Sequence, residues 1–376
     1  MPALSIREPL YELPPYSLTG DLLSFKTCPL QYRYTNIGAL PSSRPVQLWF
    51  GQFIHGALEE AYRIFDANRA ELPPWPLEKI QVITKRVHSR LKAQGLLARS
   101  RILEELGEQC VERAINLLGP HLLPLINRVE VRLSGAREIN VAAMPPAWKQ
   151  NRRLDRYELV GVVDVLTHIE LSKVSTANPL VAAVKEKVRE LPPEFEIIVD
   201  YKGMRRPATV SRNGRLDLGT YEWQLQNYAH LRQRQDQGPK VIAGVLAFLN
   251  ELQLTDTDFK EWKKETQDGV AGDIPLLPEW KKPSDVPDPI KLRRAIHVTE
   301  VTEASKARAL SEFDTIVRNI EICRGNEASG MTLLKSWLGN PEDKATCDAC
   351  DSKTFCPGFS QRYLSGRAIS PAIPSR

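Results

Sequence analysis

The chain has 376 residues, 42% of them hydrophobic and 26% charged, which is ordinary globular composition for one large domain or two modest ones. No apolar run reaches the roughly eighteen residues that a membrane helix needs, and the first residues lack the pattern of a secretion signal. Six cysteines are too sparse for a disulfide scaffold, so we expect reduced thiols in a cytoplasmic protein. The formal net charge of +5 is compatible with a polyanionic partner but does not establish one.

Helical periodicity dominates the first part of the chain. Apolar residues recur at three-to-four spacing over 17–34 and again over 49–65. The proline-rich stretch ELPPWPLEK interrupts the pattern, and helical patterns resume from about 78 to 118. We therefore expect an N-terminal helical region over 1–125.

The middle of the chain changes to strand patterns, which are β-branched and bounded by turn residues. The predicted strands are 129–144, 156–171, 195–203 and 241–252, with a helix over 219–235 before the last of them. The order β-β-β-α-β predicts an α/β core with a mixed sheet over 126–252.

Two stretches have the character of insertions, 172–194 between strands and the Pro- and Trp-containing 253–290. We assign 253–300 to an insertion or linker. A charged helix from 301 to about 323 then leads into a cysteine-rich tail, so the last region is expected to cover 301–376.

Two acidic residues lie in apolar strand patterns, where a carboxylate is costly to bury unless it is paired or bound to a cation. Asp164 follows two valines, and Asp200 precedes Tyr201 and Lys202. Strand alternation places Asp200 and Lys202 on one side of the sheet and Tyr201 on the other. A surface ion pair is one interpretation. The other is a Mg²⁺ or Mn²⁺ site, formed by two acids and a lysine and suited to phosphodiester hydrolysis.

Two further pairs are weak signals when taken singly. His55 lies four residues after Gly51 on the helix over 49–65, and a lone helical histidine is more often structural than a ligand. Gln224 and Tyr228 are four residues apart, so they share a face of the helix over 219–235. Core or surface roles remain open for both pairs.

Together these residues resemble the PD-(D/E)XK nuclease superfamily. More narrowly, they resemble its RecB-like branch, which includes the AddB nuclease domain and the CRISPR-associated RecB-like exonucleases. The motifs follow the order of that family: Cys28-Pro29, Gly51 to His55, Gly161 to Asp164, Asp200 to Lys202, Gln224 to Tyr228 and a C-terminal cysteine triplet. The resemblance implies a restriction-endonuclease-like core, a mixed sheet flanked by helices, with N-terminal helices and a C-terminal iron–sulfur tail.

The resemblance also implies roles for individual residues. His55, Asp164 and Asp200 would bind the divalent metal, Mg²⁺ or Mn²⁺, together with the backbone carbonyl of Tyr201. Lys202 would be the catalytic lysine.

Beside that site, Gln224 and Tyr228 would contact nucleic acid or the lysine. One departure from the family is the lysine- and glutamate-rich 172–194, which separates the two acidic strands. This insertion could reshape a substrate channel or add a partner surface.

Three cysteines lie within ten residues, Cys347, Cys350 and Cys356. Tetrahedral metal sites and iron–sulfur clusters usually take four ligands, so a fourth is needed. The resemblance implies that Cys28 is that ligand and that the four hold a [4Fe–4S] cluster, joining the two ends of the chain. A zinc site is the alternative, and a third interpretation leaves Cys28 merely buried. Cys110 and Cys323 are expected to be core thiols.

The implied activity is that of a metal-dependent DNA exonuclease on single strands or ends. No P-loop pattern occurs, so any motor would be a separate protein. Basic segments at 202–215 and 230–235 are expected along a phosphate backbone. The rings of Trp223, Tyr221 and Tyr228 could stack on bases, although at least one is expected in the core. Two alternatives remain: a non-cleaving nucleic-acid-binding protein, and a partner-dependent processing subunit of a repair or CRISPR-type complex.

Overall fold

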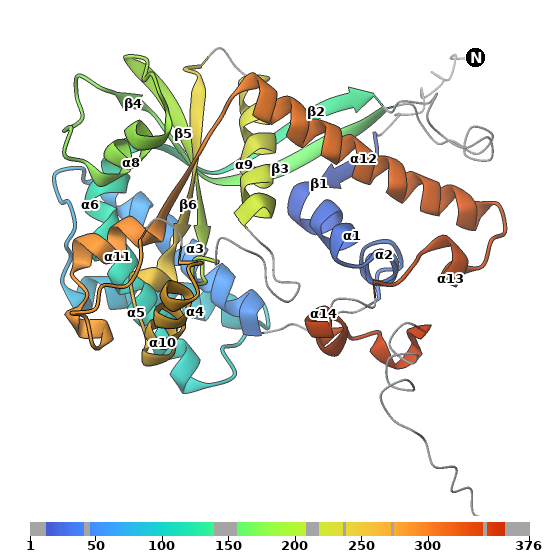
Figure 1. The fold of residues 1–376 in the computed structure, drawn as a ribbon, viewed down its shortest axis with the longest axis horizontal. Coiled ribbons are helices and arrows are strands. Elements are labelled where there is room, and N and C mark those ends of the chain that lie inside the picture. Colours follow the sequence, from blue (N-terminus) through green and yellow to red (C-terminus); the bar gives the residue numbers. More distant parts are fainter. Residues whose placement is uncertain are drawn as a thin grey trace, which may run out of the picture. The chain divides into compact units, whose positions relative to one another are not determined.

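A computed structural model describes residues 13–40, 46–138, 156–207, 218–235, 238–271, 274–340 and 344–357 (Figure 1). Its internal contacts divide the chain into two compact units. Unit 1 comprises residues 1–41, 134–161 and 311–376, and unit 2 comprises 42–133 and 162–310. The four consecutive regions expected from the sequence remain a prediction. Within the described ranges, no helix is long and apolar enough to cross a bilayer.

Seven strands in the described part of the chain form a mixed sheet. They are β1 (Pro15–Ser17), β2 (Ile126–Glu138), β3 (Arg156–Thr167), β4 (Ile169–Glu170), β5 (Glu194–Lys202), β6 (Val241–Phe248) and β7 (Ile296–Glu300). The order is β1-β3-β5-β6-β7, with β2 beside β3 and β4 beside β5. β5 runs parallel to β6, whereas β3 and β7 run antiparallel to their neighbours β5 and β6. This sheet, flanked by helices, confirms the predicted α/β class and is consistent with a restriction-endonuclease-like core.

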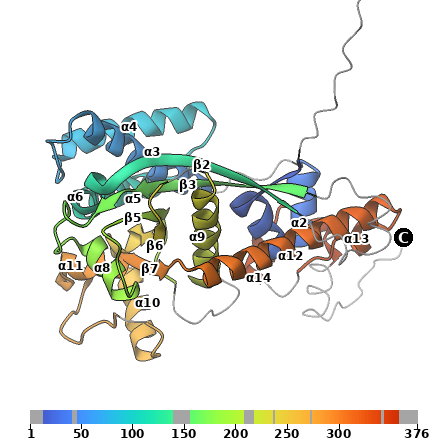
Figure 2. The same ribbon diagram turned by 90° about the horizontal axis from the view of Figure 1, so that it is seen from above.

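The central strands β5 and β6 are apolar and almost wholly buried because helices cover both of their faces. Ile197, Val199 and Tyr201 of β5 belong to the main hydrophobic core, which also contains α3 (Val46–Ala67), α4 (Leu77–Ala93) and α5 (Arg101–Arg113). The alternate residues, Asp200 and Lys202 among them, therefore point to the other face of the sheet. Figure 2 shows α3 and α4 on one side of these strands.

The other face of β5 and β6 is covered by α9 (Leu218–Gln233). Helix and sheet approach closely at Gly244, where an added Cβ would lie 2.7 Å from side-chain atoms of Leu225. A glycine is therefore needed at this position. It lets α9 pack close enough to the sheet for the side chains of the helix to reach the end of β5. The predicted helices 49–65 and 219–235 are both confirmed.

Both expected insertions contain helices. Within 172–194, α8 (Pro179–Lys187) buries Leu180, Val181 and Val184 in the main core. The segment 253–290 contains α10 (Asp256–Gln267) and the start of α11 (Asp288–Ala295). It has a small core of its own, formed by Leu254, Phe259, Trp262, Ile274, Leu276 and Val286. The second insertion is therefore a separately packed subdomain of unit 2.

Unit 1 packs aromatic rings from distant parts of the chain. The Tyr157 ring stacks on Phe313 of α12 (Glu303–Ala328) with centroids 5.8 Å apart, and Tyr16 meets Tyr157 edge to face. Elsewhere in the unit, Arg33 donates two hydrogen bonds to Glu327, at 2.7 and 2.6 Å. These contacts join the N-terminal segment to the later part of α12.

Two secondary-structure predictions need correction, and one strand was missed. The expected helix over 17–34 is broken at Cys28, which is extended (φ −161°) because the following Pro29 disfavours helical backbone before it. The strand predicted over 241–252 ends at Phe248 and continues as a 3₁₀ turn. β7 was not predicted at all. Much of the strand expected over 129–144 is β2, but residues 139–144 lie outside the described residues.

Candidate active site

The two sheet acids lie on neighbouring antiparallel strands of unit 2. Val165 pairs with Val199 and Leu166 with Ile198, so one further step of this register brings Asp164 opposite Asp200. The backbone N–H of Tyr201 donates a hydrogen bond of 2.8 Å to Asp164 Oδ2. Asp200 is only 4% exposed. Both carboxylates are thus held by the sheet itself.

His55 reaches the same place from α3. Its Nδ1 lies 3.4 Å from Asp164 Oδ1, and its Nε2 lies 3.0 Å from the carbonyl oxygen of Tyr201. The histidine and the three strand residues predicted as ligands (His55, Asp164, Asp200 and Tyr201) therefore converge in one site.

Lys202 is held on the face of the sheet that α9 covers. Its Nζ lies 2.5 Å from Asp200 Oδ2, donates to Gln224 Oε1 at 3.3 Å, and stands 4.7 Å above the ring of Tyr221. Gln224 Nε2 in turn donates to the hydroxyl of Tyr228 at 2.8 Å. From the sequence, Gln224 and Tyr228 are expected to contact either nucleic acid or the lysine. Gln224 does contact the lysine, and contact of either residue with nucleic acid stays a prediction.

The aromatic side chains of α9 correct the base-stacking expectation. Tyr221, Trp223 and Tyr228 are all buried, and the indole N–H of Trp223 donates to the carbonyl of Ala309. None of these three rings offers a free face to a base, because each packs inside unit 2.

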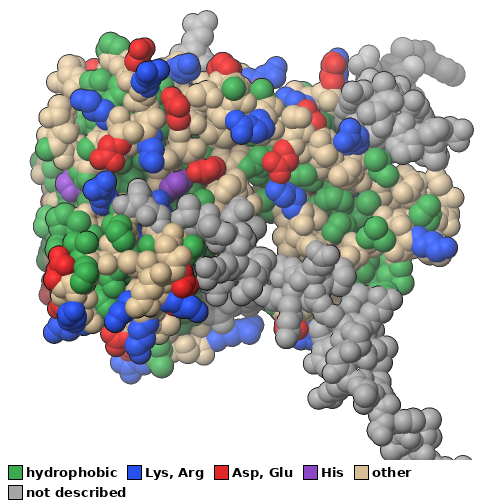
Figure 3. Space-filling model, viewed as in Figure 1, with side chains coloured by type: hydrophobic (Ala, Val, Ile, Leu, Met, Phe, Trp, Pro, Cys, Tyr) green, Lys and Arg blue, Asp and Glu red, His purple; other side chains and the backbone are tan. Residues whose placement is uncertain are grey.

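The expected basic path is also changed. Arg232, in the segment 230–235, is buried in a two-bond pair with Glu196, and residues 208–215 lie outside the described residues. On the described part of the face in Figure 3, lysine and arginine side chains are interspersed with acids. Sequence runs of positive charge therefore overstate the basic surface, because some of that charge is neutralised internally.

The charges of the site shift each other's protonation. Burial raises the pKa of Asp200 to about 6, and the neighbouring Asp164 adds to this, while Lys202 opposes it. For Asp164, burial also favours the protonated form, but His55, the Tyr201 N–H and Lys202 together hold its pKa below the ordinary value. Burial lowers the pKa of His55, but Asp164 more than compensates and raises it to about 9. The two acids thus have different environments although they lie side by side.

Glu130 on β2 is a site residue that the sequence did not reveal. His55, Glu130 and Asp164 each offer a ligand atom, and these atoms all lie within 4.8 Å of one another. Glu130 has a φ of +50°, a left-handed conformation that is uncommon for a residue with a side chain. In sequence it alternates with valines and reads as a solvent-facing strand position, so no pattern distinguished it.

This donor set fits a divalent cation. Carboxylate and carbonyl oxygens with one imidazole suit Mg²⁺ or Mn²⁺. Asp200 Oδ2 is buried and, despite its close approach to Lys202, receives no hydrogen bond of good geometry. A cation bound at this oxygen would share it with Lys202, whose Nζ lies 2.5 Å away.

The four cysteines predicted as cluster ligands all belong to unit 1. Cys28 lies at the helix break, Cys347 in α14 (Lys344–Ala349), and Cys350 and Cys356 flank the turn Lys353–Phe355. Burial raises the pKa of Cys350, and the negative charges of the other three thiols add to the effect. Among the described residues, however, no three of these sulfurs lie within 4.8 Å of one another. The geometry thus does not by itself establish an iron–sulfur cluster.

Comparisons with known proteins bear on this site. No curated protein matches the chain. A solved structure titled "Crystal structure of SSO0001" matches with 13% identity over 88% of this chain and 95% of that one, and its TM-score of 0.24 carries no structural conclusion. Residues 20–174 match the family model of the PD-(D/E)XK nuclease superfamily, a range that includes His55, Glu130 and Asp164 and ends before Asp200. Over these residues, which are fewer than half of the chain, the sequence is similar to the PD-(D/E)XK nuclease superfamily.

Proposed function

We propose that the protein is a metal-dependent DNA nuclease, an exonuclease that hydrolyses phosphodiester bonds in single strands or at ends. The observation that carries this proposal is the convergence of His55, Glu130 and Asp164 within 4.8 Å, beside the buried pair of Asp200 and Lys202. A structural ion pair would not need a histidine and three acids from four different elements at one point.

His55, Asp164, Asp200 and the Tyr201 carbonyl would hold the metal, with Glu130 as an added ligand. When bound, a divalent ion supplies Lewis-acid stabilisation of negative charge on a scissile phosphate. Each protein group here is fixed beforehand: the Tyr201 N–H orients Asp164, and Asp164 orients the imidazole of His55. Such preorganisation is how protein sites gain most of their electrostatic effect.

Lys202 is directed into the site by three neighbours. Asp200, the Gln224 amide oxygen and the Tyr221 ring hold its ammonium group. From that position the lysine can orient a water molecule and stabilise charge that develops on a phosphate. Gln224 is itself fixed by Tyr228, so α9 supports the lysine through two successive contacts.

The proposal extends to an iron–sulfur cluster on Cys28, Cys347, Cys350 and Cys356, placing the protein in the RecB-like branch. The mutual influence of these thiols supports a shared site. One Cys-x-x-Cys pair, a five-residue gap and a remote single cysteine favour the cluster over a zinc ribbon, which more often has two such pairs. We place the protein in the cytoplasm, where sparse cysteines stay reduced.

The test is cleavage of end-labelled single- and double-stranded DNA, without metal and with Mg²⁺ or Mn²⁺. We expect metal-dependent cleavage by the wild type and a loss of about 10³-fold or more in D200A and K202A, as for removal of central electrostatic groups. K240A, which changes an exposed lysine immediately before β6, is the matched control.

Two outcomes would contradict the proposal. Intact DNA in both metals would favour the non-cleaving alternative, unless activity appeared on adding a partner protein. Full activity in K202A would show that the site has been assigned wrongly.

A further inference from the structure

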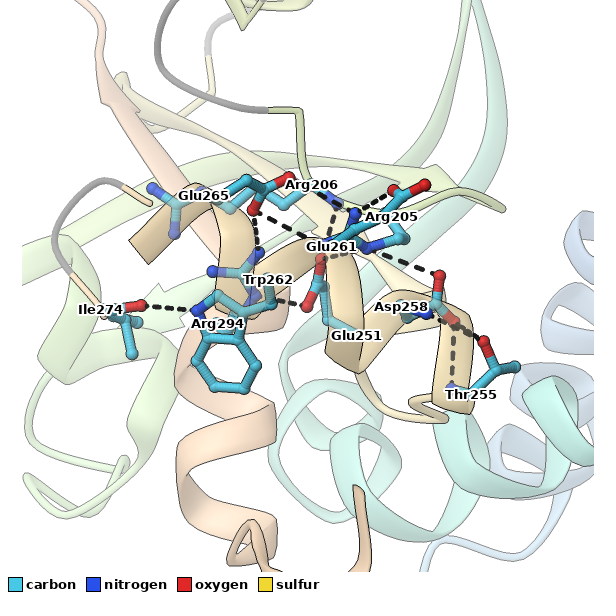
Figure 4. Close-up of polar contacts among 10 residues, drawn as sticks. All are labelled: Arg205, Arg206, Glu251, Thr255, Asp258, Glu261, Trp262, Glu265, Ile274 and Arg294. Atoms are coloured by element: carbon cyan, nitrogen blue, oxygen red, sulfur yellow. Dashed lines mark hydrogen bonds and ion pairs between the residues drawn. The ribbon is translucent and has the colours of Figure 1, made fainter. Parts of the chain in front are cut away.

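The chain immediately after Lys202 is held by a network of charged groups (Figure 4). β5 ends at Lys202, where its pairing with β6 also ends. Gly203 packs against α3 so closely that a Cβ there would lie 3.0 Å from Ile54, the residue before His55. Beyond this point the segment has no sheet pairing, so its position depends on what binds residues 204–206.

Glu251 is the first anchor. It follows β6 and is fully buried. Its Oε1 accepts a hydrogen bond of 2.9 Å from the backbone N–H of Arg206, and its Oε2 accepts one of 2.5 Å from Arg294. A buried carboxylate is tolerated only with such partners, so the backbone at Arg206 is firmly held.

Arg205 is the second anchor, and it reaches into the separately packed insertion. Its guanidinium lies 2.6 Å from Glu261, 3.3 Å from Glu265 and 3.5 Å from Asp258, all on α10. Figure 4 shows these acids directed toward Arg205 from one helix. The insertion thus presents an acidic face to the residue three positions after the catalytic lysine candidate.

Arg294 joins the two anchors. It pairs with both Glu251 and Glu265 and stacks over the ring of Trp262, its Cζ 4.3 Å from the centroid. Trp262 belongs to the core of the insertion. The network is therefore continuous from the end of β5 to the interior of the insertion.

We propose that Arg205 is a positioning residue for Lys202, through which the insertion 253–290 holds the ammonium group against Asp200 and Gln224. The proposal rests on the proposed function for its meaning in catalysis. The physical reason is that strand pairing ends at Lys202, so the backbone beyond it is fixed by other contacts. The first side chain after Lys202 with several charged partners is that of Arg205. Misplacement of a catalytic group by about 1 Å can cost about 100-fold in rate.

R205A is the informative variant because it does not leave a buried carboxylate unpaired. Glu251 keeps Arg294 and the Arg206 N–H, and the three α10 acids are at least partly exposed. R205K restores a positive charge and should recover part of the effect. R293A, which removes an exposed arginine on α11 next to Arg294, is the matched control.

The first readout does not depend on cleavage. Acetylation of Lys202 by acetic anhydride, followed by peptide mass spectrometry, reports how well its amine is held. We expect R205A to raise the Lys202 acetylation rate about tenfold, while exposed Lys173 in the same samples is unchanged and R293A matches the wild type. Equal Lys202 rates in R205A and the wild type overturn the proposal, even if the wild type cleaves no DNA.

The second readout is a double-mutant cycle on single-turnover cleavage. R205A should lower the rate constant about 10- to 100-fold with DNA and Mn²⁺ affinities within twofold of wild type. In the K202A background R205A should lower the residual rate no further. Equal losses in both backgrounds would show a role in overall folding and overturn the proposal.

Discussion

The acidic site of unit 2 and the cysteine site of unit 1 are built from different kinds of segment. Asp164 and Asp200 lie on strands of the sheet and His55 on a long helix packed in the core, so the fold fixes them without a bound group. The cysteines lie at a helix break, on a six-residue helix and beside a three-residue turn, and three of the four are only partly buried. The difference teaches that the acidic site is fixed by the fold itself, whereas the proposed cluster would have to bring its cysteines together as it binds.

The largest expected effect comes from breaking the cysteine site. C350S should remove iron and sulfide from the protein purified without air and lose its brown colour. It should destabilise unit 1 by about 2–5 kcal/mol, the scale of losing a covalent crosslink. Metal analysis and limited proteolysis measure both effects, and unit 2 should stay resistant to protease.

C323S is the control because Cys323 lies in α12 of the same unit and is not one of the four. If the wild-type protein is colourless and contains stoichiometric zinc, the four cysteines hold zinc and the cluster assignment is wrong. Unchanged iron in C350S would remove this cysteine from the ligand set.

A smaller effect is expected from replacing Glu130. This change tests whether Glu130 is a metal ligand and whether its left-handed backbone costs stability. E130G should weaken Mn²⁺ binding about 10- to 100-fold, measured by calorimetry. Glycine adopts a φ of +50° without steric cost, so the metal-free stability should stay within about 1 kcal/mol of wild type or rise. E138Q, on the same strand, should change neither quantity; unchanged Mn²⁺ affinity in E130G would exclude Glu130 as a ligand.

The smallest effect is the pH dependence of metal-free stability. Burial raises the pKa of Asp200 to about 6, so folding favours its protonated form. The contribution of Asp200 to the free energy of unfolding is therefore fully present below about pH 3.8 and is lost as the pH rises through 6. The stability of D200N relative to wild type should therefore rise by about 1.4 kcal/mol between pH 5 and pH 7.5, in thermal melts with chelator.

Glu327 of unit 1 provides the opposite case. Its hydrogen bonds from Arg33 hold its pKa below the ordinary 4.5, so its contribution is present above that value and is lost only at lower pH. The stability deficit of E327Q should therefore stay constant between pH 5 and 7.5. If the stability difference between D200N and wild type is equally constant over this pH range, then burial does not destabilise the charged form of Asp200.

The sequence predicted the parts of the site that local periodicity encodes. Alternation along β5 correctly put Asp200 and Lys202 on one side and Tyr201 on the other, because a strand with a period of two leaves no other arrangement. The four-residue spacing of Gln224 and Tyr228 likewise predicted their contact on one helix face.

What the sequence missed depends on contacts between distant segments. The left-handed backbone of Glu130 and the charged partners of Arg205 have no local pattern, because a residue's neighbours across the fold decide them. The buried pair of Arg232 and Glu196 shows the same limit, since a basic run gives no sign of which charges are already neutralised. β7 was missed for a related reason: its five residues follow a basic helix and gain strand structure only by pairing with β6.

The close approach at Gly244 has a consequence for how this protein can vary. Any side chain there would lift α9 from the sheet at Leu225, the residue after Gln224, and so lengthen the reach from Gln224 to Lys202. The glycine thus works as a spacer of fixed thickness between a supporting helix and the lysine that it steadies. A substitution at 244 would alter the site from a position that touches none of its polar groups, so a buried and chemically inert residue helps to set the geometry of the site.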